Sequence, residues 1–180
     1  SRNLDLFMLG KETTRYLVAK NSKQANVAVF EGAMGFYDGM GKTTEASAYE
    51  LACTCDVPVV LVVNGKGAAL SIAATIKGFK DFRKDSHIVG AILNNVNPMS
   101  YLFYKDVIEQ ETGVKLLGYF PAMQDCNFES RHLGLVTAEE IGDLQQIVER
   151  LAVQAAKSVD LEALLEIARA AQPLFYKEVS

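Results

Sequence analysis

The chain has 180 residues, enough for one domain with a substantial core, and its 49% hydrophobic and 22% charged content is that of an ordinary soluble globular protein. Its net charge of −4 argues against a nucleic-acid backbone as the main partner. No apolar run is long enough to cross a bilayer, and residues 1–9 have neither the basic start nor the apolar core of a signal peptide. We therefore expect a cytoplasmic protein without nucleic-acid or membrane contacts.

The three cysteines do not form a recognisable site. Cys53, Cys55 and Cys126 lack the spacing of a zinc centre, and their odd number argues against a disulfide framework. We interpret them as packing residues, because a small apolar side chain fills gaps well.

The first half of the chain is expected to alternate between helices and strands. Residues 11–24 are predicted to be helical, and the alternation of residues 27–31 predicts a short buried strand that ends in a carboxylate. A glycine-rich stretch follows, and the Ala, Glu and Leu content of residues 44–55 predicts a second helix. Residues 58–63, PVVLVV, are typical of a strand covered on both faces.

The second half repeats this alternation. We predict helices over residues 68–82 and 101–112 and strands over residues 88–93 and 115–120, joined by turns rich in Asn, Gly and Pro. Short links between alternating strands and helices indicate an α/β fold with a right-handed, mostly parallel sheet flanked by helices.

The chain is expected to form one domain over residues 1–180, ending in helices over residues 137–171. Thr137 and Glu140 fit a capping box at the start of these helices. Asp160 fits the cap of the last one.

The glycine-rich stretch after residues 27–31 is the strongest candidate site. Gly32 and Gly35 lack a Cβ, so the backbone there can approach a ligand closely. Glu31 and Asp38 place a carboxylate at each end, and a carboxylate at the end of a parallel strand is well placed to hold a hydrated Mg²⁺ on a nucleotide. From spacing alone, a tight connection with helix-capping carboxylates stays open as the alternative.

The sequence GMGKTT at residues 39–44 is similar to a phosphate-binding loop but does not match its pattern. In G-x-x-x-x-G-K-[ST], counted back from Gly41, the first glycine falls on Phe36, and Gly35 is one residue too early. We therefore interpret the Lys-Thr pair as the approach to the following helix.

Six motifs of the chain together are more specific than any one of them. They are RNLD (2–5), FEGAMGFYDG (30–39), PVVLVV (58–63), ILNNV (92–96), GYFP (118–121) and RHLGLV (131–136). In this order and spacing they resemble the synthetase domain of cobyrinic acid a,c-diamide synthases, a family related in fold to dethiobiotin synthetase and to P-loop ATPases. The resemblance extends over essentially the whole chain.

The resemblance implies an ATP- and Mg²⁺-dependent amidoligase of cobalamin biosynthesis. Members of the family activate the a and c carboxylates of a corrinoid acid as acyl phosphates, and ammonia from a linked glutaminase domain then forms the amides. Such chemistry needs positioning and charge neutralisation rather than a nucleophilic side chain. The implied partners are therefore a corrinoid carboxylate substrate and a glutaminase domain.

The resemblance also implies roles for single residues. Glu31 matches a Mg²⁺ ligand near the γ-phosphate, and Asp38 matches a second acidic residue at the metal or the substrate carboxylate. Asn94 matches the residue that recognises adenine, and the backbone of GYFP lines the same pocket, while RHLGL has either a substrate or a packing role. The expected set is catalytic and metal-binding Glu31 and Asp38; nucleotide-binding Gly32, Gly35, Asn94, Gly118 and Pro121; and substrate-binding Tyr37, Arg131 and His132.

The chain also departs from the family pattern. Family members begin with a strand and a phosphate loop and continue into a glutaminase, and we expect both to be missing here. Asn64 stands where Asp is usual. We therefore expect a middle segment of a larger amidoligase, incompetent by itself, in which an uncovered strand edge favours self-association into a homo-oligomer.

Two other functions are considered. One is a non-catalytic binding or scaffold domain of the same fold, which the combination of Glu31, Asp38 and Asn94 disfavours. The other is amidation of nickel-sirohydrochlorin on equivalent carboxylates, which the residues do not distinguish. The order of a and c amidation, the oligomeric state, and ATP binding without a phosphate loop are left open.

Overall fold

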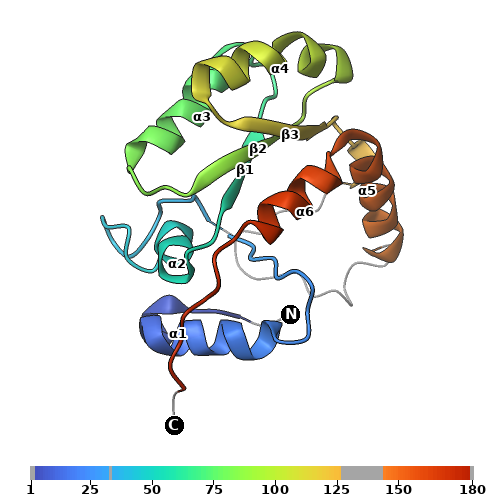
Figure 1. Ribbon diagram of the computed structural model, residues 1–180. Helices are drawn as coiled ribbons and strands as arrows, with labels where there is room; N and C mark the ends of the chain where they lie inside the picture. The colour runs from blue at the N-terminus through green and yellow to red at the C-terminus, as the bar shows by residue number, and fades with distance from the viewer. Residues whose placement is uncertain (1–2, 33, 127–143, 179–180) are drawn as a thin grey trace. The chain divides into compact units, whose positions relative to one another are not determined.

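The computed structural model describes residues 3–32, 34–126 and 144–178 (Figure 1). Helices and strands alternate from residue 48 to residue 120. In chain order the elements are α1 (Leu6–Ser22), α2 (Ala48–Cys55), β1 (Val59–Asn64), α3 (Ser71–Phe82), β2 (Ile88–Asn94), α4 (Pro98–Thr112), β3 (Lys115–Phe120), the 3₁₀ helix η1 (Gln124–Cys126), α5 (Leu144–Ser158) and α6 (Leu161–Arg169).

The chain groups into two compact units, and each is described by itself. The first unit comprises Ser1–Val59, Gly78–Val89 and Leu164–Ser180, and the second comprises Val60–Lys77 and Gly90–Ala163. The expected single domain over the whole chain stays a prediction.

The second unit is built on a sheet with strand order β1-β2-β3. Strands β2 and β3 pair in parallel, from Gly90 opposite Lys115 to Asn94 opposite Phe120. The predicted α/β fold with a parallel sheet flanked by helices is therefore confirmed.

Helices α4 and α5 pack against β3 (Figure 1). Leu93 of β2, Ile108 of α4 and Leu117 of β3 are almost completely buried. Full burial of an aliphatic side chain of this size contributes about 1.5–3 kcal/mol to stability. Apolar burial between the sheet and α4 thus holds the strand ends in place.

Gly118 allows the chain after α5 to lie against β3. Its φ is +143°, and a Cβ there would collide with the carbonyl oxygen of Ser158. Val159 forms an isolated antiparallel bridge with Gly118, and the N–H of Asp160 donates to the carbonyl of Leu117 at 2.7 Å. A side chain at position 118 would push this connection off the sheet.

The first unit contains α1 packed on α2. The Arg15 Nε donates to the carbonyl of Thr54 at 2.7 Å, and the Lys11 ammonium lies 3.0 Å from the Glu50 carboxylate. Helix α1 starts five residues before the predicted one, and Gly10 breaks its regularity with a φ of +70°. Side-chain contacts therefore fasten α1 to both ends of α2.

The structure overturns the buried strand predicted over residues 27–31. These residues belong to no strand, and Val29 is 88% exposed. A strand forms only when its backbone groups pair with a neighbour, and no backbone hydrogen bond joins this segment to another described segment. The alternation of apolar residues has the side-chain pattern of a strand, but the segment has no neighbouring strand among the described residues with which to pair.

The prediction that residues 58–63 are covered on both faces is also wrong. Leu61 and Val63 are buried, whereas Val62 is 70% exposed. Strand β1 is the first strand in the sheet order and pairs on one side only among the described residues. A β-branched run therefore indicated the strand correctly but overstated its burial.

Helix starts follow caps that the composition did not reveal. Helix α2 begins at Ala48 rather than residue 44, because Ala46 has a φ of +61° and the Ser47 hydroxyl accepts from the N–H of Glu50. Helix α4 begins at Pro98, because Asn97 caps it and proline suits a first helical position.

The C-terminal predictions are tested only in part. Asp160 caps α6 as predicted, since its carboxylate accepts from the N–H of Ala163 at 2.9 Å. The capping box at Thr137 and Glu140 lies outside the described residues.

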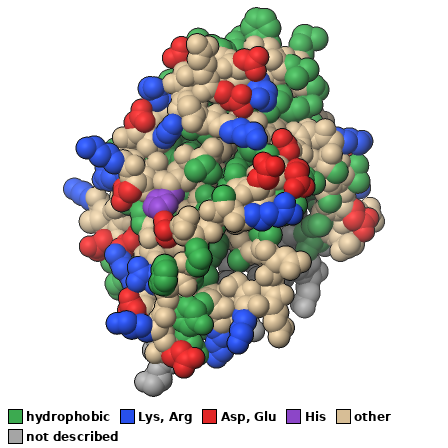
Figure 2. Space-filling model, viewed as in Figure 1, with side chains coloured by type: hydrophobic (Ala, Val, Ile, Leu, Met, Phe, Trp, Pro, Cys, Tyr) green, Lys and Arg blue, Asp and Glu red, His purple; other side chains and the backbone are tan. Residues whose placement is uncertain are grey.

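The described part of the chain has no helix long and apolar enough to cross a membrane. Basic and acidic side chains are interspersed on the face drawn in Figure 2. All three cysteines are free thiols, and Cys55 is buried as the packing interpretation predicted.

Candidate functional site

The glycine-rich loop of the first unit folds back on itself between Gly35 and Asp38. The N–H of Asp38 donates to the carbonyl of Gly35 at 2.9 Å, which closes a tight turn. The Asp38 carboxylate lies over Gly35, where a Cβ would collide with it. Glu31 and Asp38 are both exposed. The loop thus presents two carboxylates to solvent, one of them beside bare backbone.

Tyr37 anchors this loop. Its hydroxyl donates to the carbonyl of Phe79 at 2.6 Å, and its ring stacks on that of Phe79 at 6.0 Å between centroids. Burial raises the pKa of the Tyr37 hydroxyl, so it stays protonated and keeps donating. The hydroxyl of Tyr37 is therefore already engaged, and the predicted substrate role of this residue stays a prediction.

Tyr49 holds the same loop from α2. Its N–H donates to the carbonyl of Phe36 at 2.9 Å, and its hydroxyl donates to the Asp85 carboxylate at 2.8 Å. This hydrogen bond lowers the pKa of Asp85 and raises that of Tyr49. Because the two shifts are opposite, the bond persists over a wide pH range.

The strand ends of the second unit carry a network of asparagine side chains. The Asn95 amide donates to Asn64 Oδ1 at 3.1 Å, and the N–H of Lys66 donates to the same oxygen at 3.2 Å. The N–H of Asn95 donates to Asn94 Oδ1 at 3.0 Å. The network lies at the carboxyl ends of parallel strands, the edge at which α/β folds bind ligands.

Backbone hydrogen bonds join the ends of all three strands at this edge of the sheet. The N–H of Gly65 donates to the carbonyl of Asn94 at 2.8 Å, and that of Val96 donates to the carbonyl of Phe120 at 3.0 Å. Gly65 is buried, and a Cβ there would collide with the Val96 side chain. The turns after β1 and β2 are therefore fixed relative to one another.

Asn94 keeps part of its hydrogen-bonding capacity for a ligand. Its Oδ1 accepts from Asn95, whereas its Nδ2 donates to no other described residue. An amide nitrogen has two N–H groups, and its oxygen has a second lone pair. Asn94 can thus donate to a base, and its oxygen can accept one more hydrogen bond.

The other predicted nucleotide-binding residues of the second unit differ in access. Gly118 is buried under the connection between α5 and α6, whereas Pro121 is partly exposed after β3. Of the two, Pro121 is the one that a ligand can reach. Arg131 and His132 lie outside the described residues, so their substrate role stays a prediction.

The predicted site residues divide between the two units. In the first unit these are Glu31, Gly32, Gly35, Tyr37 and Asp38, all within one loop. A Cβ at Gly32 would lie 3.0 Å from the Cβ of Ala48, so a larger residue there would have to displace its neighbour by a few tenths of an ångström. Asn94, Gly118 and Pro121 belong to the second unit.

The loop carboxylates fit Mg²⁺. This ion is usually bound by one or two carboxylates together with waters and substrate phosphates, so a single exposed carboxylate of the loop can supply the protein's share of the ligands. Among the residues the structure describes, no three or more His, Cys, Asp or Glu side chains gather to form a metal cage. The donor set therefore suits an ion that arrives with phosphate ligands.

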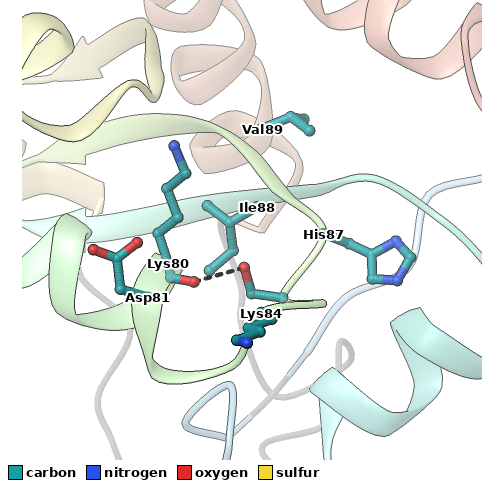
Figure 3. A pocket seen from close by; sticks show the side chains of 7 residues that line it. Lys80, Asp81, Lys84, His87, Ile88 and Val89 are labelled. Atoms are coloured by element: carbon teal, nitrogen blue, oxygen red, sulfur yellow. Dashed lines mark hydrogen bonds between the residues drawn. The ribbon is translucent and has the colours of Figure 1, made fainter.

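A hollow of about 350 Å³ lies elsewhere in the first unit, between the end of α3 and the start of β2 (Figure 3). The side chains of Lys80 and His87 point in different directions, and the drawn hydrogen bond joins the Ser86 hydroxyl to the Lys80 carbonyl. The hollow lies at the amino end of β2, whereas Asn94 lies at the carboxyl end of that strand. The hollow is lined by Lys80, Asp81, Lys84, Ser86, His87, Ile88 and Val89.

Sequence reasoning missed three contacts of these sites. The Tyr37–Phe79 and Tyr49–Asp85 hydrogen bonds join residues 42 and 36 positions apart, a separation that local patterns do not reveal. The sequence does contain an indication of the hydrogen bond from Asn95 to Asn64, because consecutive asparagines after a strand favour a turn residue with left-handed backbone conformation. Asn95 does adopt a φ of +58°.

Comparison with known proteins gives a family match. A family model described as an AAA domain matches residues 9–130. No solved structure matches the chain.

Curated relatives match nearly the whole chain. It is 40% identical to the cobyrinate a,c-diamide synthase of Thermoplasma volcanium, over 97% of this chain and 38% of that protein. It is 39% identical to the proteins of the same name from Caldanaerobacter subterraneus and Salmonella typhimurium, each over 93% of this chain and 37% of the relative. The chain thus spans less than two fifths of the length of these relatives. The resemblance that the motifs indicated is confirmed.

Proposed function

Because the chain belongs to this AAA domain family, we propose that it is the ATP-binding part of a ligase that amidates the a and c carboxylates of cobyrinate. The observation that carries the proposal is the 40% identity to a cobyrinate a,c-diamide synthase along 97% of this chain. The exposed carboxylates of the glycine-rich loop support it as metal ligands, and the Asn94 amide nitrogen, which donates to no other described residue, supports it as a base contact.

The proposed reaction has two displacements. A carboxylate oxygen of the corrinoid attacks the γ-phosphorus of ATP, which forms an acyl phosphate and releases ADP. Ammonia, released by hydrolysis of glutamine in a glutaminase domain, then attacks the acyl carbon, and inorganic phosphate leaves. The first step brings two anions together, so the protein must position them and neutralise their charge.

Side chains of the loop are proposed to serve this step. Glu31 and Asp38 hold Mg²⁺, and the ion supplies charge neutralisation at the phosphates when it is bound. The backbone at Gly32 and Gly35 leaves room for the nucleotide to approach. No residue of the loop has to form a covalent bond.

Other residues are proposed to bind the two substrates. Asn94 donates from Nδ2 to the adenine edge, beside Pro121, which is partly exposed. Arg131 and His132 are proposed to contact phosphate or corrinoid carboxylates, for which a cation offers strong hydrogen bonds. Tyr37 contacts substrate only through atoms that its bond to Phe79 leaves available.

Because the segment is expected to be incompetent by itself, the proposal is tested in the larger amidoligase that contains it, incubated with cobyrinate, ATP and MgCl₂ and with either ammonium chloride or glutamine as the nitrogen source. We expect mass spectrometry of the corrinoid to detect two successive exchanges of hydroxyl for amide, with one ADP formed for each. The matched control is Asp38→Asn, which keeps the size of the side chain and removes its charge.

The outcomes separate the parts of the proposal. Amide formation with ammonium but not with glutamine would overturn the glutamine dependence and keep the ligase. A higher kcat/KM for nickel-sirohydrochlorin would overturn the choice of tetrapyrrole. Absence of both ADP and amide with either nitrogen source would overturn the function.

A further inference from the structure

Five aromatic residues of the first unit pack together at the middle of the glycine-rich loop, and two of them belong to the loop itself. Their ring centroids lie 4.8 to 6.0 Å apart in five pairwise contacts. The proposed reaction assigns no chemistry to this cluster as a whole. We call it the aromatic clasp; it consists of Phe36, Tyr37, Tyr49, Phe79 and Phe82.

Tyr37 is the centre of the aromatic clasp. Its ring contacts all four of the others, and it lies nearly parallel to that of Phe79, at 16°. Its hydroxyl donates to the carbonyl of Phe79 at 2.6 Å, which fixes the rotation of the ring. Stacking and hydrogen bonding therefore hold one residue in a single orientation.

The neighbours of Tyr37 are fastened as well. The carbonyl of Phe36 accepts from the N–H of Tyr49, whose hydroxyl is bound to Asp85. The Arg83 guanidinium lies over the Phe82 ring, 4.3 Å from its centroid. The clasp thus joins the loop to α2 and to the end of α3.

Asp38 directly follows this anchored residue and has no such support of its own. Its carboxylate is exposed and makes no hydrogen bond to another described side chain. Its direction is set by the backbone, through the turn from Gly35 and the fixed position of Tyr37. An exposed carboxylate without partners binds a metal ion well only if its backbone is held.

We propose that Tyr37 is a positioning residue for Asp38, and that the aromatic clasp keeps the Asp38 carboxylate over Gly35 in the orientation that holds a divalent cation. This inference rests on the proposed role of Asp38 as a Mg²⁺ ligand. It gives the ring and hydroxyl of Tyr37 a task in the same site without requiring contact with the corrinoid.

The first test measures the loop without any ligand. Hydrogen–deuterium exchange is followed at residues 34–41 in the wild-type chain and in Tyr37→Phe, which keeps the ring and loses the hydrogen bond. We expect exchange to be about fivefold faster in Tyr37→Phe, and faster still in Tyr37→Leu. Tyr104→Phe, in α4 of the second unit, is the matched control and should leave the loop unchanged.

The second test separates positioning from general stability. ATP binding is titrated at several Mg²⁺ concentrations and again in EDTA. We expect Tyr37→Phe to raise the Mg²⁺ concentration for half-maximal binding about fivefold, and to leave the affinity for metal-free ATP unchanged. Tyr49→Phe, which loses the bond to Asp85, serves as a second variant should Tyr37→Leu not fold, and it should shift the Mg²⁺ dependence in the same direction.

The outcomes distinguish this inference from the proposed function. Wild-type protein that binds no Mg-ATP would overturn the function itself, while the exchange data would still report whether Tyr37 holds the loop. If the wild type binds Mg-ATP and Tyr37→Phe has the same Mg²⁺ dependence, the positioning role is overturned and the function stands. An equal loss of affinity with and without Mg²⁺ would also overturn it, because a merely structural residue behaves in that way.

Discussion

The Asp38 carboxylate occupies the space in which a Cβ of residue 35 would stand, so Gly35 and Asp38 are sterically coupled across one turn. Gly35 is not among the residues with positive φ. The space beside Gly35 is therefore taken by a side chain three residues later, while the glycine's own backbone conformation is not a left-handed one. This coupling makes it possible to move one carboxylate while the backbone stays as it is.

The Gly35→Ala variant should weaken metal binding selectively. The added methyl group displaces the Asp38 carboxylate, and we expect the Mg²⁺ concentration for half-maximal ATP binding to rise about tenfold. The free energy of unfolding should change by less than about 1 kcal/mol, because a flexible side chain is all that must move. Calorimetric titration at several Mg²⁺ concentrations measures the first effect and urea unfolding the second.

Gly78→Ala in α3 is the matched control for this variant. A Cβ at position 78 meets no other atom within 4 Å. Alanine there should stabilise the protein by about 0.5–1 kcal/mol and leave the Mg²⁺ dependence unchanged. A Gly35→Ala protein with wild-type Mg²⁺ dependence would contradict the role given to Asp38.

Gly118→Ala should be among the most damaging single substitutions. The residue has a φ of +143°, and its Cβ would collide with the Ser158 carbonyl. Backbone strain and overpacking together should lower the free energy of unfolding by about 3 kcal/mol. Urea denaturation measures this, with the exposed Lys115→Ala on the same strand as a control, and a loss below about 1 kcal/mol would show that the α5–α6 connection shifts freely.

Substitutions of Asn95 should separate backbone strain from the side-chain bond. The residue has a φ of +58° and its amide donates to Asn64. Asn95→Ala loses the bond and keeps an unfavourable backbone, so it should destabilise the protein by about 1–2 kcal/mol. Asn95→Gly should be about 1 kcal/mol more stable than Asn95→Ala in thermal or urea unfolding. Equal stability of the two variants would argue against a left-handed residue here.

The stability of the second unit should depend on Tyr101 at alkaline pH. Burial raises the pKa of Tyr101 to about 12, and the Glu109 carboxylate acts in the same direction. Between about pH 10 and pH 12 the folded protein keeps a proton that the unfolded chain releases, so stability falls as pH rises, by about 2 kcal/mol. The stabilising contribution is complete below about pH 10.

Urea unfolding at about pH 9 and pH 11.5 tests this linkage, since the two values lie on either side of the start of the transition. In Tyr101→Phe the decrease in stability with pH should be smaller than in the wild type. The variant also loses the hydrogen bond to the Leu116 carbonyl, which costs about 1 kcal/mol at both pH values. Tyr104→Phe should keep the wild-type dependence, and an unchanged slope in Tyr101→Phe would contradict the assignment.

Local sequence patterns predicted those strands and helices whose apolar residues are buried in the core. The strand over residues 115–120 has the predicted bounds, β2 ends one residue later than predicted, and β1 is shifted by one residue at both ends. Runs of β-branched residues between turn formers specify such strands locally. Caps such as Ser47 and Asn97 changed the helix starts, because a side-chain hydrogen bond decides where a helix begins.

Long-range pairing is what the sequence did not reveal. The strand predicted at residues 27–31 needed a partner strand, and the burial of β1 depended on its place in the sheet. Candidate site residues could be predicted where they lie close together in the sequence, as Glu31 and Asp38 do in one loop. The contacts of Tyr37 with Phe79 and of Tyr49 with Asp85 join distant segments, so only the structure gives them.

Calorimetric titration of ATP, with Mg²⁺ and again with EDTA, tests the central claim most directly. It compares the wild-type chain with Glu31→Gln and Asp38→Asn, which keep side-chain size and remove one charge each. We predict Mg²⁺-dependent binding of ATP by the wild type and about tenfold weaker binding by each variant, with no difference among the three in EDTA. A metal–nucleotide site at this loop would be contradicted if the wild type did not bind ATP. It would also be contradicted if, with Mg²⁺ present, both variants bound ATP as tightly as the wild type.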